Sequence, residues 1–305
     1  MRKISSIIAV CLLLAHTVNA QTQKGQTIVG ENPGDNSGST ISMPDANTIA
    51  IGAFANSDGA YYGGHVRVYE WGGSSWNQKG IDLDGVNEGD WFGHSVHMPD
   101  ANTLAVGMPG NATGGYKAGM TRVFEWNGSG WVQKGSSLIG EAPEDEFGNV
   151  VYMPSSTTLA VAAWKNDGTS TQAGHVRVFN WNGTDWVQKG VDIDGEAYGD
   201  FSGNAISMPD ENTIAIGAQG NGAGGFLAGH ARVYIWDGTS WVQRGTDIDG
   251  VMQSYTGYSV AMPDPFTLAV GAPAHDEVEQ DAGKLRVYEW SGSDWTQRGL
   301  SLIHI

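Results

Sequence analysis

One unit recurs five times along this chain, and a Met-Pro pair marks each copy. The pairs begin at Met43, Met98, Met153, Met208 and Met262, so the steps are 55, 55, 55 and 54 residues. A period of about 40 to 50 residues or slightly more, with several short strands in each copy, is typical of β-propeller blades. The period therefore predicts an all-β propeller with one blade for each copy of about 55 residues.

Each copy contains four strand patterns. In the second copy the first pattern follows Phe92-Gly93 and runs to the Met-Pro pair, and the second is the apolar run 103–107. The third pattern alternates, as at 176–181, and the fourth starts at a second tryptophan, as at 186–193. Pro-Asp-Ala-Asn joins the first two strands, for example at 44–47, and Asn-Gly or a similar pair joins the last two. We therefore expect four-stranded antiparallel blades.

The chain divides into a signal peptide at residues 1–20 and a propeller at residues 21–305. Arg2 and Lys3 precede an apolar run at 7–15, and a small-residue cleavage pattern ends at Ala20. The repeats run at about 22–76, 77–131, 132–186, 187–241 and 242–295, followed by the start of a further unit. The single cysteine, Cys11, lies in the signal peptide, so the mature chain has no disulfide. These features predict a secreted or cell-surface protein without a membrane span.

Charge narrows the class of partner. Removal of the signal peptide changes the formal net charge from −17 to −19. Nucleic acids and anionic membrane surfaces attract clustered lysine and arginine, and this acidic chain offers no such cluster. We therefore expect no nucleic-acid partner, and an extracellular protein or glycan as the ligand.

The loops that differ between copies are the candidate binding face. The two tight turns of each unit hardly vary, whereas the connections 54–64, 109–119, 164–174, 219–229 and 273–283 disagree. Ten of the twelve tryptophans repeat in every copy, which indicates packing, but several other aromatic residues lie in variable segments. Such rings commonly hold sugars or protein hot spots. The candidate ligand-binding residues are Trp91, Trp164, Tyr61, Tyr62, Tyr116, Tyr198, Phe226 and Tyr255. The alternative is that some of these rings fold inward and cap a central channel.

Three aspartate pairs are the candidate metal ligands. They are Asp82 and Asp84, Asp192 and Asp194, and Asp247 and Asp249. Alternate residues of a strand share a face, so each pair can present two carboxylates to one hard cation such as calcium. The alternative, which we favour, is a solvated strand edge protected by charge. We expect no required cofactor, and weak calcium binding as the second possibility.

The histidines at the start of the third strand offer a weaker metal signal. His65, His175 and His230 share one repeat position, but Met120 and Lys284 replace them in the other copies. We therefore expect no metal role for this position.

The chain resembles the FG-GAP repeat family, which is related to the β-propeller at the head of integrin α chains. The resemblance rests on Phe92-Gly93 followed by Gly107-Met108-Pro109, on Phe147-Gly148 followed by Ala162-Ala163, and on the segment 195–203. It covers the mature chain and implies a propeller used for adhesion or recognition, of the bacterial secreted type. Family blades that bind calcium use a long Asp-rich loop between the first two strands, and that loop is short here. Family propellers commonly have seven blades, so either an arc of a longer ring or a closed five-bladed ring is expected.

These observations predict a secreted, non-catalytic recognition or adhesion module that binds through the variable-loop face. No Ser-His-Asp order, zincin motif or phosphate-binding glycine loop stands out, so we expect no enzyme. A structural surface repeat without a discrete site is the first alternative, and a propeller hydrolase or lyase is the second.

Overall fold

The computed structural model describes residues 22–276 and 282–299. The signal peptide predicted at 1–20 and residues 300–305 of the further unit lie outside the described residues. Within those ranges the chain forms 24 β-strands and no helix, which confirms the predicted all-β class. Accordingly, the described ranges hold no helix of the length and hydropathy that a membrane crossing requires.

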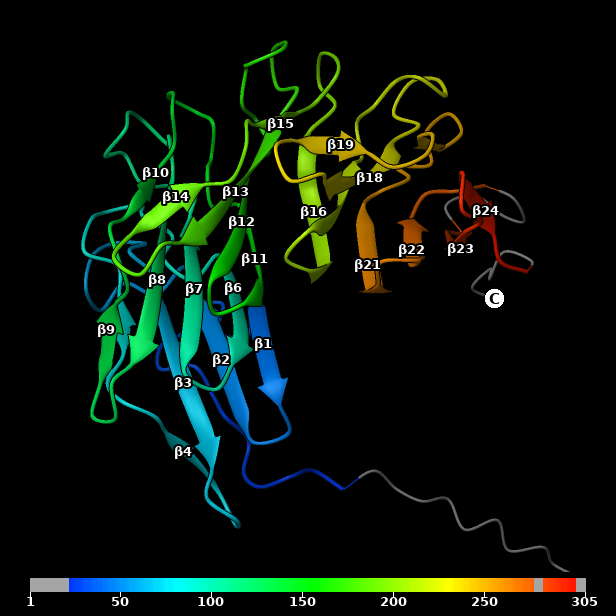
Figure 1. Ribbon diagram of the computed structural model, residues 1–305. Coiled ribbons are helices and arrows are strands. Elements are labelled where there is room, and N and C mark those ends of the chain that lie inside the picture. Colours follow the sequence, from blue (N-terminus) through cyan, green and yellow to red (C-terminus); the bar gives the residue numbers. More distant parts are fainter. Residues whose placement is uncertain (1–21, 277–281, 300–305) are drawn as a thin grey trace, which may run out of the picture.

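The strands group into five antiparallel sheets, one for each copy of the repeat (Figure 1). Blade 1 contains β1 (Thr40–Asp45), β2 (Thr48–Ala53), β3 (His65–Trp71), β4 (Trp76–Gln78) and β5 (Leu83–Asp84). Blade 2 contains β6 (Ser95–Asp100), β7 (Thr103–Met108), β8 (Met120–Trp126), β9 (Trp131–Gln133) and β10 (Leu138–Ile139). Blade 3 contains β11 (Val150–Ser155), β12 (Thr158–Ala163), β13 (His175–Trp181), β14 (Trp186–Gln188) and β15 (Ile193–Asp194). Blade 4 contains β16 (Ser202–Asp210), β17 (Thr213–Ala218), β18 (His230–Trp236), β19 (Trp241–Gln243) and β20 (Ile248–Asp249). Blade 5 contains β21 (Ser259–Asp264), β22 (Thr267–Ala272), β23 (Lys284–Trp290) and β24 (Trp295–Gln297).

The predicted fourth strand is split in two in blades 1 to 4. In blade 1, β4 pairs with the end of β3, where Trp76 lies opposite Trp71. The shorter β5 pairs with the start of β3, where Asp84 lies opposite His65. The split therefore brings the aspartate pair of the fourth strand beside the histidine that opens the third.

The Met-Pro pair lies within the first strand, and the turn is shorter than predicted. Strand β6 continues through Pro99 to Asp100, and its register with β7 shifts between His97 and Asp100. Proline has no N–H to donate to the ladder, so a local irregularity accommodates it. Asp100 then caps the turn, since its Oδ1 accepts the Asn102 N–H at 2.8 Å. The prediction of a four-residue Pro-Asp-Ala-Asn turn was wrong, because its Pro-Asp half belongs to the first strand. The predicted capping role of the aspartate is confirmed.

The innermost strands of successive blades pack on one another. Contacts join β1 to β6, β6 to β11, β11 to β16, and β16 to β21. In the described part of the chain β21 does not pack on β1 in this way, and Figure 1 shows β4 and β24 at opposite flanks. The five blades therefore form an arc in which ring closure is not seen.

Glycine at the end of the second strand permits close packing of one blade on the next. A Cβ on Gly107 would lie 1.9 Å from the carbonyl oxygen of Gly148, at the start of blade 3. A Cβ on Gly217 would meet Gly257 at the same distance. Because no side chain fits there, the backbones of neighbouring blades approach each other directly.

Tryptophan pairs and a lysine join the blades at the outer rim. The two rings of each pair have centroids 5.4 to 5.6 Å apart. The indole N–H of Trp131 donates to the Lys79 carbonyl of the preceding blade at 2.8 Å, and three later blades repeat this bond. Lys79 Nζ donates in turn to the Ala101 carbonyl at 2.7 Å. The packing role predicted for the repeated tryptophans is confirmed.

Residues 22–31 make the same hydrogen bonds with blade 1 that the end of each blade makes with the next blade. The Lys24 carbonyl accepts the Trp76 indole N–H at 2.9 Å, and Lys24 Nζ donates to Asn47 Oδ1 at 3.0 Å. Arg67 donates to the Val29 carbonyl at 2.7 Å. This segment therefore supplies to blade 1 the contacts that a fourth strand supplies to the next blade.

Candidate functional site

The variable loops share one backbone frame. In blade 2 the Asn111 amide donates to Asp90 Oδ1 at 2.8 Å, and Asn111 Oδ1 accepts the Thr113 N–H at 2.9 Å. The asparagine begins the loop between the second and third strands, and the aspartate belongs to the connection that precedes the blade. The equivalent amide bonds join Asn56 to Asp35, Asn166 to Asp145, and Asn221 to Asp200. The buried aspartates therefore hold the loops in place.

A pair of left-handed residues fixes the far end of each loop. Lys117 and Glu146 have φ angles of 52° and 54°, and the Glu146 N–H donates to the Lys117 carbonyl at 3.0 Å. The same bond joins Tyr62 to Trp91, Gln172 to Phe201, and Leu227 to Tyr255. Residues other than glycine rarely adopt a positive φ, so the hydrogen bonds around these pairs must impose it. The loops thus differ in side chains but not in backbone path.

The candidate aromatic residues divide into exposed and partly buried rings. Tyr61, Tyr116, Tyr198 and Phe226 are 63% to 74% exposed, and Tyr62 is 41% exposed. Trp91, Trp164 and Tyr255 are partly buried. The Trp164 indole donates to Glu146 Oε2 at 2.8 Å, and its ring lies 5.4 Å from that of Phe201. Structure therefore presents mainly the tyrosines and Phe226 to solvent.

One aromatic hollow lies between the loops of blades 1 and 2. It has a volume of about 290 Å³ and is lined by Tyr61, Tyr62, Glu88, Gly89 and Trp91. The rings of Tyr61 and Tyr62 meet edge to face, with centroids 4.6 Å apart. The Lys117 ammonium lies 4.6 Å from the Trp91 ring centroid, which leaves the hollow flanked by a cation and a carboxylate. Three of the eight predicted ligand-binding residues thus come together here.

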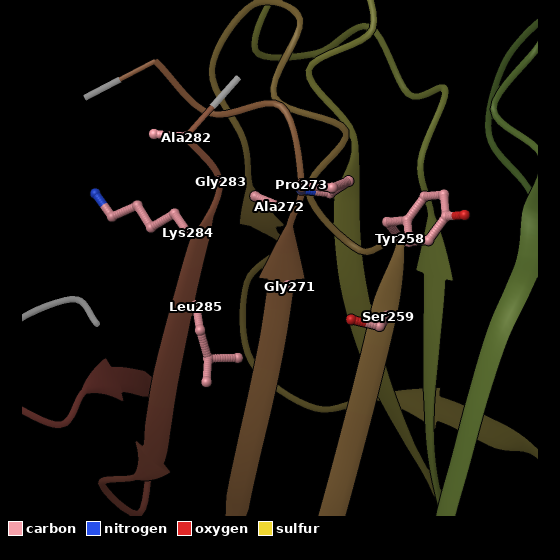
Figure 2. A pocket seen from close by; sticks show the side chains of 9 residues that line it. All are labelled: Tyr258, Ser259, Gly271, Ala272, Pro273, Ala282, Gly283, Lys284 and Leu285. Carbon is pink, nitrogen blue, oxygen red and sulfur yellow. The ribbon is translucent and has the colours of Figure 1, made fainter. Parts of the chain in front are cut away.

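A second hollow, of about 360 Å³, lies at the open side of blade 5, beside Pro273 and Gly283 at the two ends of the last variable loop. Figure 2 shows it between the start of β21, where Tyr258 and Ser259 lie, and the start of β23, where Leu285 lies. In blade 2 the glycine equivalent to Gly271 contacts the next blade, because a Cβ there would meet Gly148. Among the described residues Gly271 has no such contact, so this hollow lies where a following blade packs in the other units.

The aspartate pairs lie beside buried histidines and a glutamate. His65 Nδ1 is 3.5 Å from Glu31 Oε2 and 4.0 Å from Asp82 Oδ2. His175 Nδ1 is 3.4 Å from Asp192 Oδ2 and 4.0 Å from Asp194 Oδ1. His230 Nδ1 lies 3.9 Å from Glu196 Oε2, 3.7 Å from Asp247 Oδ2 and 3.9 Å from Asp249 Oδ1. Three equivalent clusters therefore stand on blades 1, 3 and 4. Their members are Glu31, His65 and Asp82; Glu141, His175 and Asp192; and Glu196, His230 and Asp247.

Burial sets the protonation of these groups. Burial lowers the pKa of His175 and of His230 to about 4, so both imidazoles are neutral at pH 7. Burial is the larger cause that raises the pKa of Asp194 and of Asp249, and repulsion from the other aspartate of each pair is the second cause. The clusters of blades 3 and 4 therefore bring neutral imidazoles against crowded carboxyl groups and are not simple ion pairs.

Sequence reasoning found the aspartates of these clusters but missed the other members. The histidines were assigned no metal role because two copies lack them, and Glu31, Glu141 and Glu196 were not considered. A signal was nevertheless present. Blade 2, one of the two copies that lack the histidine, also lacks the glutamate and both aspartates.

Comparisons with known proteins give the fold and no family. No family model and no curated protein matches this chain. A candidate 6-phosphogluconolactonase from Bacteroides uniformis is similar in structure, with a TM-score of 0.51 at 8% identity over 87% of this chain and 85% of that chain. The β-propeller domain of the Trilobed protease from Pyrococcus furiosus has a TM-score of 0.49 at 10% identity, over 84% of this chain and 69% of that chain. The GH74 xyloglucanase from Xanthomonas campestris gives 0.48 at 12% identity, over 85% of this chain and 38% of that one.

The five repeated antiparallel blades, of four or five strands each, define this chain as a β-propeller protein. At 8% identity the likeness to the first of these structures bears on the fold alone, and the activities in the three names give no argument about this chain.

Proposed function

We propose that this chain is a secreted, non-catalytic recognition or adhesion module of the FG-GAP type, which binds an extracellular protein or glycan through its variable-loop face. The main support is the aromatic hollow of about 290 Å³ between blades 1 and 2. Its rings offer apolar faces to a sugar or to an apolar side chain, and Glu88 offers a hydrogen-bond acceptor. Such a lining is suited to binding and brings together no nucleophile and base.

The fixed backbone of the loops also favours recognition over a purely structural repeat. Tyr61, Tyr116 and Phe226 occupy one loop position in blades 1, 2 and 4, where blade 3 has Thr171. All four loops keep the same asparagine-to-aspartate bond, so the fold does not require the ring. An exposed ring that the fold does not require is best explained by a contact outside the chain.

The test uses the biotinylated mature chain on arrays of glycans and extracellular matrix proteins, followed by affinity measurement on the best ligand. Tyr61→Thr and Trp91→Asn introduce residues that blades 3 and 1 carry at these positions, Thr171 and Asn36. Asn36 has a φ of 56°, so asparagine suits the left-handed backbone at Trp91. Each variant should raise Kd by about tenfold or more if the ring is a hot spot.

The control is Phe266→Asn, on the opposite face. Phe266 is an exposed ring in the turn between β21 and β22, where blades 1, 2 and 4 carry Asn47, Asn102 and Asn212. The Phe266→Asn variant should bind the ligand with the affinity of the wild type. Unchanged affinity in both loop variants, or an equal loss in Phe266→Asn, would contradict the proposed binding face.

A further inference from the structure

Four positions change together from blade to blade. Blade 2 has Val86, Met120, Ser137 and Ile139 at these positions, and blade 5 has Val251 and Lys284 at the two that the structure describes. Blades 1, 3 and 4 carry glutamate, histidine and two aspartates there: Glu31, His65 and Asp82 with Asp84; Glu141, His175 and Asp192 with Asp194; Glu196, His230 and Asp247 with Asp249. In blade 1 the first two positions are 34 residues apart in the chain and the next 17, so no local rule of strand or turn couples them. Joint presence and joint loss indicate that the side chains serve one common purpose.

The histidine of each cluster is buried, and at least one of its ring nitrogens lacks a hydrogen-bond partner. His65, His175 and His230 are 1%, 1% and 0% exposed. Neither ring nitrogen of His65 or His230 has a hydrogen-bond partner, nor has Nε2 of His175. Buried polar atoms are nearly always paired, so an unpaired Nδ1 that faces carboxylates calls for a partner that protein atoms do not supply.

The shortest distance from the histidine to a carboxylate in each cluster is close to the spacing of two ligands around one ion. The nearest carboxylate oxygen lies 3.5, 3.4 and 3.7 Å from Nδ1 of His65, His175 and His230. Hydrogen bonds between such atoms are shorter, about 2.7 to 3.2 Å. Two ligand atoms at about 2.0 to 2.1 Å from a tetrahedral zinc ion stand about 3.4 Å apart. Within each cluster the three ligand atoms lie within 4.8 Å of one another.

Outer partners orient the carboxylates so that one oxygen of each faces the histidine. Arg177 and Arg232 each contact Oε1 of the cluster glutamate at 3.2 Å, and Arg67 does so at 3.5 Å. A glutamine two residues after the rim tryptophan holds Oδ1 of the first aspartate, through Gln78 to Asp82 at 2.5 Å, Gln188 to Asp192 at 2.6 Å and Gln243 to Asp247 at 2.6 Å. Bonds of this kind around metal ligands fix their orientation.

We propose that blades 1, 3 and 4 each bind one divalent transition-metal ion of the zinc class, through the histidine Nδ1, the glutamate and the first aspartate, with the second aspartate adjacent. An imidazole nitrogen with carboxylate oxygens suits zinc and its neighbours, whereas calcium prefers six to eight oxygens. The glutamate comes from the connection that precedes the blade, and the other ligands come from the third and fourth strands. The ion therefore links each of these blades to the segment that leads into it.

The test counts metal ions on the untagged mature chain. Protein stripped with a chelator is dialysed against zinc at low concentration, and bound zinc is measured by elemental analysis. We expect about three ions per wild-type chain. The melting temperature should rise by about 5 °C or more when zinc is restored, and calcium should not reproduce this rise.

The variants copy residues of blade 2, so the fold has already accommodated each substitution. His175→Met should lower the count to about two ions, and the triple variant His65→Met/His175→Met/His230→Met should abolish stoichiometric binding. The reverse variant Val86→Glu/Met120→His/Ser137→Asp/Ile139→Asp keeps Arg122 and Gln133 as outer partners and should add a fourth ion.

Three results would overturn the proposal. They are less than one zinc ion per wild-type chain, equal zinc in the wild type and the triple variant, and a calcium-induced rise in melting temperature as large as that with zinc. Because none of these measurements uses the loop face, failure here leaves the proposed recognition function untouched.

Discussion

At the scale of single residues, His97 shows how one side chain ties blades together and makes the fold sensitive to acid. Its Nδ1 accepts the Met153 N–H of the next blade at 3.2 Å. In blades 1 and 4 a serine hydroxyl does the same, since Ser42 accepts the Met98 N–H at 2.8 Å and Ser207 the Met262 N–H at 2.9 Å. Burial lowers the pKa of His97 to about 4, because the charged imidazolium loses its hydration there.

The first prediction follows from this pKa. A folded-state pKa below the unfolded value of about 6.5 means that the unfolded chain binds more protons between pH 6.5 and 4. Stability must therefore fall as the pH falls through this window. His97→Ser keeps the hydrogen-bond acceptor of blades 1 and 4 but does not titrate, so it should reduce the acid loss by about 1 to 3 kcal/mol.

The measurement is urea unfolding of wild type and variant at pH 7, 5.5 and 4. Burial also lowers the pKa of His94, but this group is present in both proteins, so the difference between them isolates His97. Parallel loss of stability in the two proteins would show that His97 does not contribute.

At the scale of elements, the rim lysine is the contact that most directly joins one blade to the next. Lys79 follows β4, and its Nζ donates to the Ala101 carbonyl at 2.7 Å and to Asn102 Oδ1 at 2.9 Å. The ammonium also lies 5.4 and 5.7 Å from the ring centroids of Trp126 and Trp131. It thus contacts the first turn and the outer hairpin of blade 2 together.

The second prediction is that Lys79→Met lowers the free energy of unfolding by about 1 to 3 kcal/mol, because the Ala101 carbonyl and Asn102 Oδ1 lose a charged donor and the two rings lose a cation. Lys79→Arg is the matched control. Arg244 fills this position between blades 4 and 5, where it donates to the Pro265 carbonyl at 2.9 Å and lies over Trp290. The arginine variant should keep most of the stability. Chemical denaturation measures both, and equal stability of Lys79→Met and wild type would contradict a linking role.

Elements were predictable where a single residue forces the local structure, and not where distant residues meet. Tight turns after the third strand followed from Asn127-Gly128 and its equivalents, because few other pairs adopt that backbone. The left-handed pairs of the loop face, such as Lys117 with Glu146, had no signal, because neither residue favours a positive φ and only the bond between them imposes it. The histidine clusters were hidden for a related reason. Their members meet only after β5 pairs with the start of β3, and the sequence pattern does not show that the fourth strand is split.

At the scale of the whole molecule, the two end faces of the arc are the parts that the repeat leaves without a neighbour. The exposed fraction of the methionine in each Met-Pro pair shows this difference between the end and the inner blades. Met98, Met153, Met208 and Met262 are 1% to 5% exposed, whereas Met43 in β1 is 50% exposed. At the other end, β22 alternates between buried and partly exposed residues, while β7, β12 and β17 are buried throughout. In a repeat protein, stability is the sum of such contacts between neighbours, so the end blades should open most readily.

The last prediction uses methionine oxidation to test whether these end faces are open in solution. Peroxide converts exposed methionine to the sulfoxide and reaches buried methionine only after local opening. Met43 should therefore oxidise at a rate close to that of Met252, which is 64% exposed, and about tenfold or more faster than Met98, Met153 and Met208. Peptide mapping by mass spectrometry gives all rates in one experiment. A Met43 as protected as Met98 would mean that another surface covers blade 1. Protection that fades on dilution would identify a second copy of the chain, and protection independent of concentration would identify closure within one chain.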